Sequence, residues 1–257
     1  MNDKKISVDK IVEICQGVVV SRGIASTCNN FCCDTRLLKI GDTFLALKCE
    51  AENVIKYIED AFKKGAIGCI CECDVPESLK NKYNDKFIIK VRDSVEAIQK
   101  LAEYKRSLYN IPVIAVTGSV GKTSTKEIIA SVVGEAFNVK KNQGNYNNHI
   151  GVPLTILSWD ENTECAVVEM GMNHFGEIEV LTKIAKPTVA VITNVGTAHI
   201  GILGSRENIL KAKMEILDGL QTGGTVVINN DNDLLHTCDL SNYNKVTYGI
   251  ENESDYM

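Results

Sequence analysis

Apolar runs of strand length alternate with helical segments through the second half of the chain. Strands are predicted at 111–117, 165–171, 188–195 and 223–230, with helices at 123–137, 177–186 and 206–217. Strands that consist of continuous apolar residues are typical of a parallel sheet that is covered on both faces. The pattern therefore predicts an α/β fold with a mostly parallel sheet over residues 111–257.

Shorter elements of the same two kinds come first. The pattern predicts strands at 42–48, 66–72 and 87–91 and one strong helix at 54–65. Residues 1–91 are therefore expected to form a small N-terminal α/β domain. Apolar residues then recur at helical spacing over 92–110, after Asp93 as a favourable N-cap, and we expect this helix to link the two domains.

The composition is that of an ordinary globular protein and excludes some classes of partner. Of 257 residues, 44% are hydrophobic and 24% are charged, and the net charge is -5. Nucleic-acid binders and proteins of anionic membranes usually carry a basic face, so neither class is expected. The first residues do not resemble a signal peptide, and no apolar run approaches the ~20 residues of a membrane span. A cytoplasmic protein without membrane insertion is expected.

The ten cysteines show no paired spacing that would indicate disulfides. Cys69, Cys71 and Cys73 alternate, so in a strand all three would point to one face. No C-x-x-C pair or nearby histidine completes a zinc set, which favours packing of these thiols in the core over metal binding. The same holds for Cys32 and Cys33.

A glycine loop follows the predicted strand at 111–117, in the segment "IAVTGSVGKT". The common phosphate loop is G-x-x-x-x-G-K-[ST], and here Val116 stands where its first glycine should be. Gly121, Lys122 and Thr123 keep the part that wraps phosphate oxygens, neutralises their charge and holds Mg²⁺. Because the loop lies between a strand and a helix, a phosphate site is favoured over a plain turn.

Two further polar residues follow predicted strands. Glu169 ends "CAVVE", and His199 comes after "VAVITNVGTA". In a parallel sheet both would lie at the same edge as the glycine loop, where they could bind a divalent metal together with Thr123. By itself, a loop histidine is more often structural or solvated than a ligand.

Two other segments leave alternatives open. Four asparagines crowd the segment "KKNQGNYNNHIGVPLTIL", where they could cap a turn or bind a polar ligand: Asn142, Asn145, Asn147 and Asn148. The segment "ENILKAKMEILDGL" has the pattern of an amphipathic helix. In such a helix Lys213 would normally be a solvated charge.

Taken together, these segments resemble the Mur ligases, the ATP-dependent amide-forming enzymes of peptidoglycan precursor synthesis. The resemblance rests on "CDTRLLKIGDTFLALK", "VTGSVGKTSTKEI", "GNYNNHIGVPLTIL", "VVEMGMNHFGEIEVLTKIAKPTVAVITNVGTAHIGILGS" and "KAKMEIL", and it extends over almost the whole chain. It is greatest to the MurF type. The short glycine loop is what this resemblance implies for the family.

The resemblance also implies roles for individual residues. It assigns the loop and two amides to ATP: Gly118, Ser119, Val120, Gly121, Lys122, Thr123, Ser124, Asn145 and Asn148. Lys122 would neutralise the transferred phosphoryl group. One Mg²⁺ would be bound by Thr123 and Glu169, and a second by His199 and Lys213, with Lys213 carbamoylated by carbon dioxide. Catalytic roles thus fall on Lys122, His199 and Lys213.

The implied reaction joins D-alanyl-D-alanine to UDP-N-acetylmuramoyl-tripeptide through an acyl phosphate, with a monomeric enzyme. Asp34, Thr35 and Arg36 match the D-[ST]-R signature of the UDP-sugar domain expected at 1–91. After "LALK" the family usually has G-E-x-x-D-G-H, whereas Cys49, Asn53, Val54 and Ile55 stand at the glycine and D-G-H positions here, so binding of the nucleotide sugar is expected to differ.

The resemblance further implies three domains and roughly 450 residues, in line with ~150 residues per domain. We therefore expect this chain to be a fragment that ends inside the central ATP-binding domain, lacks the C-terminal domain and is inactive alone. Two alternatives stay open. One is another ligase of this kind, either the type that adds the third residue or a cyanophycin- or folylpolyglutamate-like enzyme. The other is a remnant that binds nucleotide without catalysis.

Overall fold

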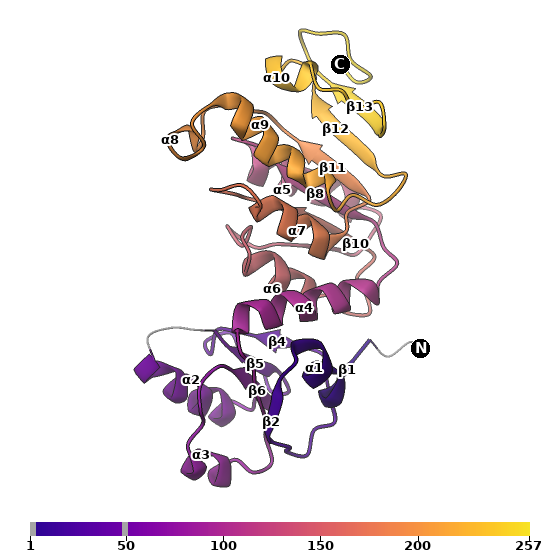
Figure 1. The fold of residues 1–257 in the computed structure, drawn as a ribbon. Helices are drawn as coiled ribbons and strands as arrows, with labels where there is room; N and C mark the ends of the chain where they lie inside the picture. Colours follow the sequence, from indigo (N-terminus) through magenta and orange to yellow (C-terminus); the bar gives the residue numbers. More distant parts are fainter. Residues whose placement is uncertain (1–3, 48–50) are drawn as a thin grey trace. The chain divides into compact units, whose positions relative to one another are not determined.

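The computed structural model describes residues 4–47 and 51–257, and the chain divides into two compact units, Met1–Leu108 and Tyr109–Met257 (Figure 1). Both units combine helices with sheets, which confirms the predicted α/β class. The described part of the second unit holds a sheet in which every strand pair is parallel. The prediction of a mostly parallel second sheet is therefore confirmed.

The first unit is a small sheet with helices. Its elements are β1 (Ile6–Ser7), α1 (Val8–Cys15), β2 (Val18–Ser21), β3 (Thr27–Cys28), β4 (Phe31–Cys32), β5 (Thr43–Ala46), α2 (Ala51–Lys63), β6 (Gly68–Cys71), α3 (Glu77–Lys82), β7 (Phe87–Lys90) and α4 (Ser94–Ser107). Among the described residues, the main sheet has the order β2-β7-β6-β5-β4. Strand β2 is antiparallel to β7, and the other neighbours are parallel.

The cysteines of β6 belong to the core of the first unit, as predicted. Cys69 and Cys71 are fully buried in a cluster with side chains of α2, and Cys73 packs against this cluster. Cys32 and Cys33 are half-buried free thiols. Within residues 4–47 and 51–257, no group of three His, Cys, Asp or Glu side chains is arranged to hold a metal. Packing in the core is therefore confirmed for Cys69, Cys71 and Cys73, whereas for the half-buried Cys32 and Cys33 it stays a prediction.

The altered family motif falls partly outside the described residues. Cys49 is not among them. Val54 is 7% exposed and Ile55 is half-buried, and both join the apolar cluster that α2 forms with the sheet. At these two positions, the apolar residues support packing of the helix.

Helix α4 begins where the sequence predicts it. The Asp93 side chain accepts hydrogen bonds from the backbone N–H groups of Val95 and Glu96, which satisfies two of the free donors of the first turn. Helix α4 packs against α1, and its residues fall in the first unit, which extends to Leu108.

The second unit alternates strands and helices along the chain. Its elements are β8 (Val113–Thr117), α5 (Lys122–Gly134), β9 (Val139–Lys141), α6 (Gly151–Leu157), β10 (Cys165–Glu169), α7 (Glu177–Ala185), β11 (Val189–Ile192), α8 (Ile200–Leu203), α9 (Arg206–Met214), the 3₁₀ turn η1 (Glu215–Leu217), β12 (Thr225–Asn229), α10 (Asp233–His236) and β13 (Asn244–Tyr248). Strand β10 is buried along its whole length, as its apolar sequence predicts for a strand covered on both faces.

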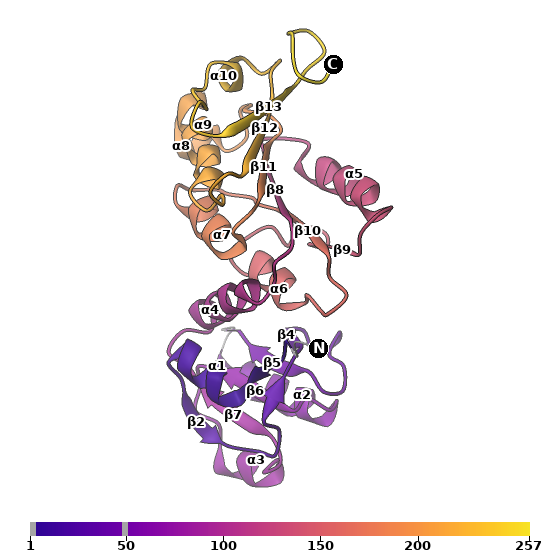
Figure 2. The ribbon, with the colours of Figure 1, turned by 90° about the vertical axis from the view of Figure 1, so that its right-hand side faces the viewer.

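The order of the strands marks where a ligand would bind. The sheet has the order β13-β12-β11-β8-β10-β9 in the described residues. After β8 the chain passes to one side of the sheet, and after β11 it passes to the other, so the order reverses between these two neighbours. Figure 2 shows α5 on one face of this sheet and α7 and α9 on the other. Ligands of open parallel sheets bind at such a reversal, outside the carboxyl ends of the strands.

Candidate active site

The glycine loop lies at this reversal and is tied to the segment that follows β11. The Ser119 N–H donates to the Asn194 carbonyl at 3.0 Å. The Val120 N–H donates to Asn194 Oδ1 at 3.0 Å, and Thr193 Oγ1 donates to the Val120 carbonyl at 2.8 Å. Ser119 Oγ accepts from the Gly196 N–H at 2.9 Å. These contacts with the segment after β11 fix the shape of the glycine loop.

Two glycines of the loop are required by its geometry. A Cβ atom at Gly118 would lie 1.8 Å from Thr193 Oγ1, which is inside any permitted contact. Gly121 has a φ of 77°, in the left-handed region that glycine adopts without strain. The close approach of β8 to β11 and the turn into α5 both depend on the absence of a side chain.

We expect Gly118→Ala to destabilise the second unit by about 1–3 kcal/mol, because the added methyl group must displace Thr193 and the loop it supports. Thermal and urea unfolding measure the change. Gly134→Ala is the matched control: a Cβ there meets no atom within 4 Å, and alanine in a helix is more stable than glycine by about 0.5–1 kcal/mol. Equal stability of Gly118→Ala and the wild type would contradict the observed packing.

The N-terminus of α5 offers an anion site next to the loop. Its N-cap, Gly121, makes no side-chain cap, so the first N–H groups of this 13-residue helix point outward with their positive partial charge. Thr123 and Ser124 are exposed, and among the described residues neither hydroxyl has a hydrogen-bond partner. Backbone donors and two hydroxyls are the groups that a phosphate–metal complex requires.

Lys122 is bent back over this loop. Its Nζ donates to the Gly118 carbonyl at 2.9 Å. Partial burial lowers the pKa of Lys122, and the negative charge of Glu169 acts in the opposite direction. The ammonium therefore lies within electrostatic range of the carboxylate at the end of β10. The flexible side chain of Lys122 can leave the Gly118 carbonyl and contact a phosphate group bound at the loop.

Glu169 is a buried carboxylate with one unbonded oxygen. The residue is 1% exposed and pairs in register with Val116 of β8. Its Oε1 accepts from Asn147 Nδ2 at 2.8 Å, whereas Oε2 has no hydrogen-bond partner among the described residues. Lys126 Nζ lies 3.9 Å from Oε2. A carboxyl group with a free oxygen at a strand end has the chemistry of a cation ligand.

Lys213 is buried beside a second positive charge. It is 2% exposed on α9, and within the described residues no hydrogen bond or ion pair satisfies its ammonium. Burial, with a smaller effect of the Lys122 charge, lowers the pKa of Lys213 to about 7. The pattern-based expectation that Lys213 is a solvated surface charge is therefore wrong, because the side chain of this residue faces inward.

His199 takes an unusual backbone conformation. Its φ is 66°, in the left-handed region, and it precedes α8 as an exposed N-cap residue. Partial burial, followed by the charges of Lys213 and Lys122, lowers the pKa of His199. A neutral imidazole is the form that binds metals. The structure thus brings Lys122, Lys213 and His199 into one electrostatic environment.

The asparagine segment divides into two kinds of residue. Asn148 Oδ1 accepts from the N–H groups of Ile150 and Gly151 in the turn that leads into α6, and Asn145 is exposed. Asn142 and Asn147 instead contact Glu169. The sequence analysis noted Asn142 and Asn147 but assigned neither a specific role. The spacing of the four asparagines does not show which of their side chains contact Glu169 at the end of β10.

The D-[ST]-R residues lie in the first unit, after β4. The Arg36 guanidinium donates twice to Asp34 and holds the pKa of that carboxyl at about 2. Lys64 Nζ donates to the Thr35 carbonyl at 3.0 Å. The Arg36 side chain is 85% exposed, so Asp34 orients a cation that remains accessible from solvent. Such a cation can contact an anionic group.

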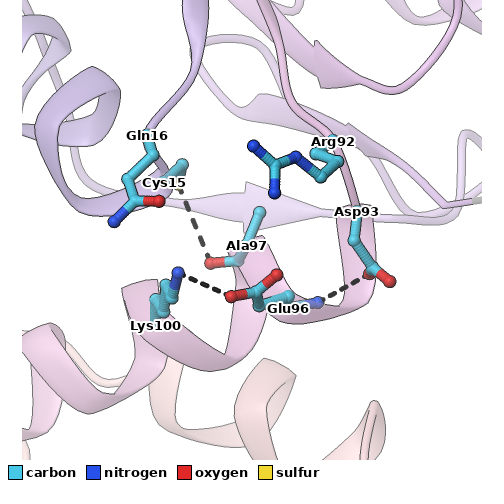
Figure 3. A pocket seen from close by; sticks show the side chains of 7 residues that line it. All are labelled: Cys15, Gln16, Arg92, Asp93, Glu96, Ala97 and Lys100. Carbon is cyan, nitrogen blue, oxygen red and sulfur yellow. Dashed lines mark hydrogen bonds and ion pairs between the residues drawn. The ribbon is translucent and has the colours of Figure 1, made fainter.

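A separate small cavity in the first unit does not suit a nucleotide. It encloses about 50 Å³ and is lined by residues of α1, α4 and the turn before α4, drawn in Figure 3: Cys15, Gln16, Arg92, Asp93, Glu96, Ala97 and Lys100. Small-molecule sites usually have ≈ 300–1,000 Å³. The positive charges of Arg92 and Lys100 in its lining are balanced by the carboxylates of Asp93 and Glu96, and Lys100 pairs with Glu96 at 2.6 Å.

Over the described part of the chain, no helix is both long and apolar enough to span a bilayer.

The glycine loop, the open helix N-terminus and the buried carboxylate at the strand reversal define a phosphate-binding α/β unit. Comparison with known proteins agrees with this class. Residues 116–257 match the model of the Mur ligase middle domain, which is more than half of the chain. The chain therefore belongs to the Mur ligase family.

Within this family, the chain is similar to proteins of one type. The chain is 39% identical, over 98% of its length, to UDP-N-acetylmuramoyl-tripeptide--D-alanyl-D-alanine ligase of Bacillus subtilis, and covers 54% of that protein. It superposes on MurF of Acinetobacter baumannii with a TM-score of 0.82 and 30% identity, over 95% of this chain and 53% of that one. It superposes on MurF ligase of Thermotoga maritima in complex with ADP with a TM-score of 0.75 and 34% identity, over 87% of this chain and 51% of that one. The chain spans about half the length of these relatives.

Proposed function

We propose that the protein is an ATP-dependent amide ligase that joins D-alanyl-D-alanine to UDP-N-acetylmuramoyl-tripeptide in the cytoplasm. The observation that carries this proposal is the buried Glu169 carboxylate, with one free oxygen, at the strand reversal that also holds the glycine loop. The named relatives of similar sequence, one of them solved with ADP, support the choice of substrates.

ATP would bind through its phosphates to residues 118–124. The backbone N–H groups at the start of α5 would surround the phosphate oxygens, and Lys122 would move from the Gly118 carbonyl to the γ-phosphate. Asn145 and Asn148 lie on the exposed segment before α6, where their amides could border the same ligand. The lysine charge would stabilise the negative charge that develops as the phosphoryl group is transferred.

The residues of the site fit divalent cations. Mg²⁺ usually binds one or two carboxylates together with phosphate oxygens, and it would neutralise charge on the transferred group. Glu169 and Thr123 would hold one ion. Lys213 and His199 would hold a second, provided that Lys213 carries a carbamate. Within the described part of the chain, His, Cys, Asp and Glu residues form no group of three that could hold a metal by themselves, so phosphate oxygens, water and a carbamate would supply the other ligands.

The environment of Lys213 favours this modification. A lysine with its ordinary pKa of about 10.4 is well under 1% neutral at pH 7, whereas a pKa of about 7 leaves near half of the amine neutral. The lone pair of the neutral amine can attack the carbon of CO₂, with loss of a proton, to give a carbamate of charge -1. The product would replace an unpaired buried cation with an anion beside the positive charge of Lys122.

In the reaction, the terminal carboxylate of the tripeptide would attack the γ-phosphate of ATP and become an acyl phosphate, with ADP as the leaving group. The amine of D-alanyl-D-alanine would then attack the acyl carbon, lose a proton and displace inorganic phosphate to form the amide. Phosphorylation supplies a leaving group that a carboxylate lacks. In the first unit, Asp34, Thr35 and Arg36 would contact the UDP-sugar, with the exposed Arg36 guanidinium as the group suited to an anion.

The direct test is product formation by the full-length protein as its gene encodes it. With Mg-ATP and UDP-N-acetylmuramoyl-tripeptide, we expect D-alanyl-D-alanine to give equal amounts of inorganic phosphate and of a product of pentapeptide mass. A panel of amino acids and dipeptides serves as control. Preference for a single amino acid would point to another ligase of the family, and ADP binding without any product would point to a non-catalytic protein.

A further inference from the structure

Lys126 is a fully buried cation on α5, one helical turn after Lys122. Its Nζ donates to the Asn142 carbonyl at 2.9 Å and lies 3.1 Å from Glu127 Oε1. It is also 3.9 Å from Glu169 Oε2. Burial of an ammonium group is costly unless nearby groups compensate its charge, so these contacts are needed to keep Lys126 in place.

The side-chain amide of Asn142 forms hydrogen bonds that replace those of a backbone beyond the end of β9. Strand β9 ends at Lys141, which pairs with Val167 of β10. Beyond that point, Asn142 Oδ1 accepts from the Glu169 N–H and Asn142 Nδ2 donates to the Glu169 carbonyl, both at 2.9 Å. Asn142 is 1% exposed. Its amide therefore holds both backbone polar groups of Glu169 where the neighbouring strand has stopped.

The 3.9 Å separation leaves the free oxygen of Glu169 available. Hydrogen bonds from N–H to oxygen span about 2.7–3.2 Å, so the Lys126 ammonium lies too far from Oε2 to form one. It can still compensate the negative charge of the carboxylate, because electrostatic attraction in a buried site extends beyond contact distance. Lys126 thus balances the charge of Glu169 without occupying the oxygen that would bind a cation.

We propose that Lys126 and Asn142 are positioning residues for the Glu169 carboxylate. Asn142 fixes the backbone of Glu169, and Lys126 holds Asn142 from the phosphate-loop helix and compensates the carboxylate charge. This inference rests on the proposed function, in which Glu169 binds Mg²⁺ beside the nucleotide. Residues that orient metal ligands typically affect metal affinity by 10–100-fold when they are changed.

The test measures how Mg²⁺ supports nucleotide binding, without turnover. Binding of a fluorescent ADP analogue is followed during Mg²⁺ titration, and the midpoint is the Mg²⁺ concentration at half-maximal binding. We expect Lys126→Met to raise the midpoint about 10- to 100-fold, with ADP affinity in EDTA unchanged. Asn142→Ser should act in the same direction, and it provides the answer if Lys126→Met does not fold.

Lys141→Met is the matched control, because Lys141 pairs with Glu127 at the surface without contacting Glu169. Its midpoint should stay within about twofold of the wild type. Glu169→Gln separates the two proposals. A raised midpoint in Glu169→Gln with normal midpoints in Lys126→Met and Asn142→Ser would overturn the positioning role alone. A normal midpoint in Glu169→Gln would overturn the metal role of Glu169, and this inference with it.

Discussion

Replacement of Lys122 by alanine is expected to lower ATP-dependent phosphoryl transfer by about 100- to 1,000-fold, the usual cost of losing one charge-stabilising group in an active site. Lys122 is the lysine that reaches the loop, through its contact with the Gly118 carbonyl. The Lys126 ammonium cannot replace it, because that group is held by the Asn142 carbonyl and is fully buried. Phosphate release by the full-length protein, under saturating substrates, measures the loss.

Lys183→Ala serves as the control for this change. Lys183 is a lysine of α7 that pairs with Glu179 at the surface, and exposed pairs of this kind contribute little to stability. Its removal should leave turnover unchanged. Turnover of Lys122→Ala at the wild-type rate would refute the assignment of the glycine loop to ATP phosphates.

Lys213→Ala is expected to lower ligase activity by about 100-fold, with partial recovery when formate or acetate is added. The reason is that a short carboxylate can occupy the space of the missing carbamate and restore a negative ligand. In the wild type, [¹³C]bicarbonate should give a carbamate signal in the ¹³C spectrum that Lys213→Ala lacks. This signal should grow as pH rises through about 7, because the neutral amine is the reactive form and the pKa of Lys213 lies there.

Lys211 provides a close comparison, since it lies two residues earlier on α9 and is exposed over the Phe175 ring. Lys211→Ala should keep both activity and the carbamate signal. Full activity of Lys213→Ala without added carboxylate would mean that Lys213 has no part in the reaction. Loss of activity without recovery, together with an absent carbamate signal in the wild type, would instead assign Lys213 a role as an unmodified amine.

In the second unit, strands that are buried on both faces could be predicted, because burial requires a continuous run of apolar residues. Strands β8 and β10 lie inside the sheet and are apolar up to their last residues, Thr117 and Glu169, so their pattern was sufficient. Strand β9 was missed because two of its three residues are lysines, and β13 begins with Asn244 and Lys245. Edge strands tolerate such polar residues, and their pairing depends on contacts with distant segments.

The site could be predicted in part for the same reason. Residues 118–124 have a recognisable local spacing, and Glu169 stands out in the sequence as a single acid at the end of an apolar run. The burial of Lys213 and the roles of Lys126 and Asn142 have no local signal. Each depends on which face of a helix meets the sheet, or on which loop residue reaches the end of a strand.

The hydrogen bonds that shape the glycine loop have a consequence for the order of folding. Their donors and acceptors are 73 to 77 positions apart in the chain. Because contacts between distant segments form late, the loop can reach its final shape only after β11 has been placed beside β8. During synthesis, a chain that has emerged as far as α5 would carry the complete glycine motif without a structured phosphate site. Nucleotide can therefore stabilise the second unit only once Thr193 to Gly196 have joined it.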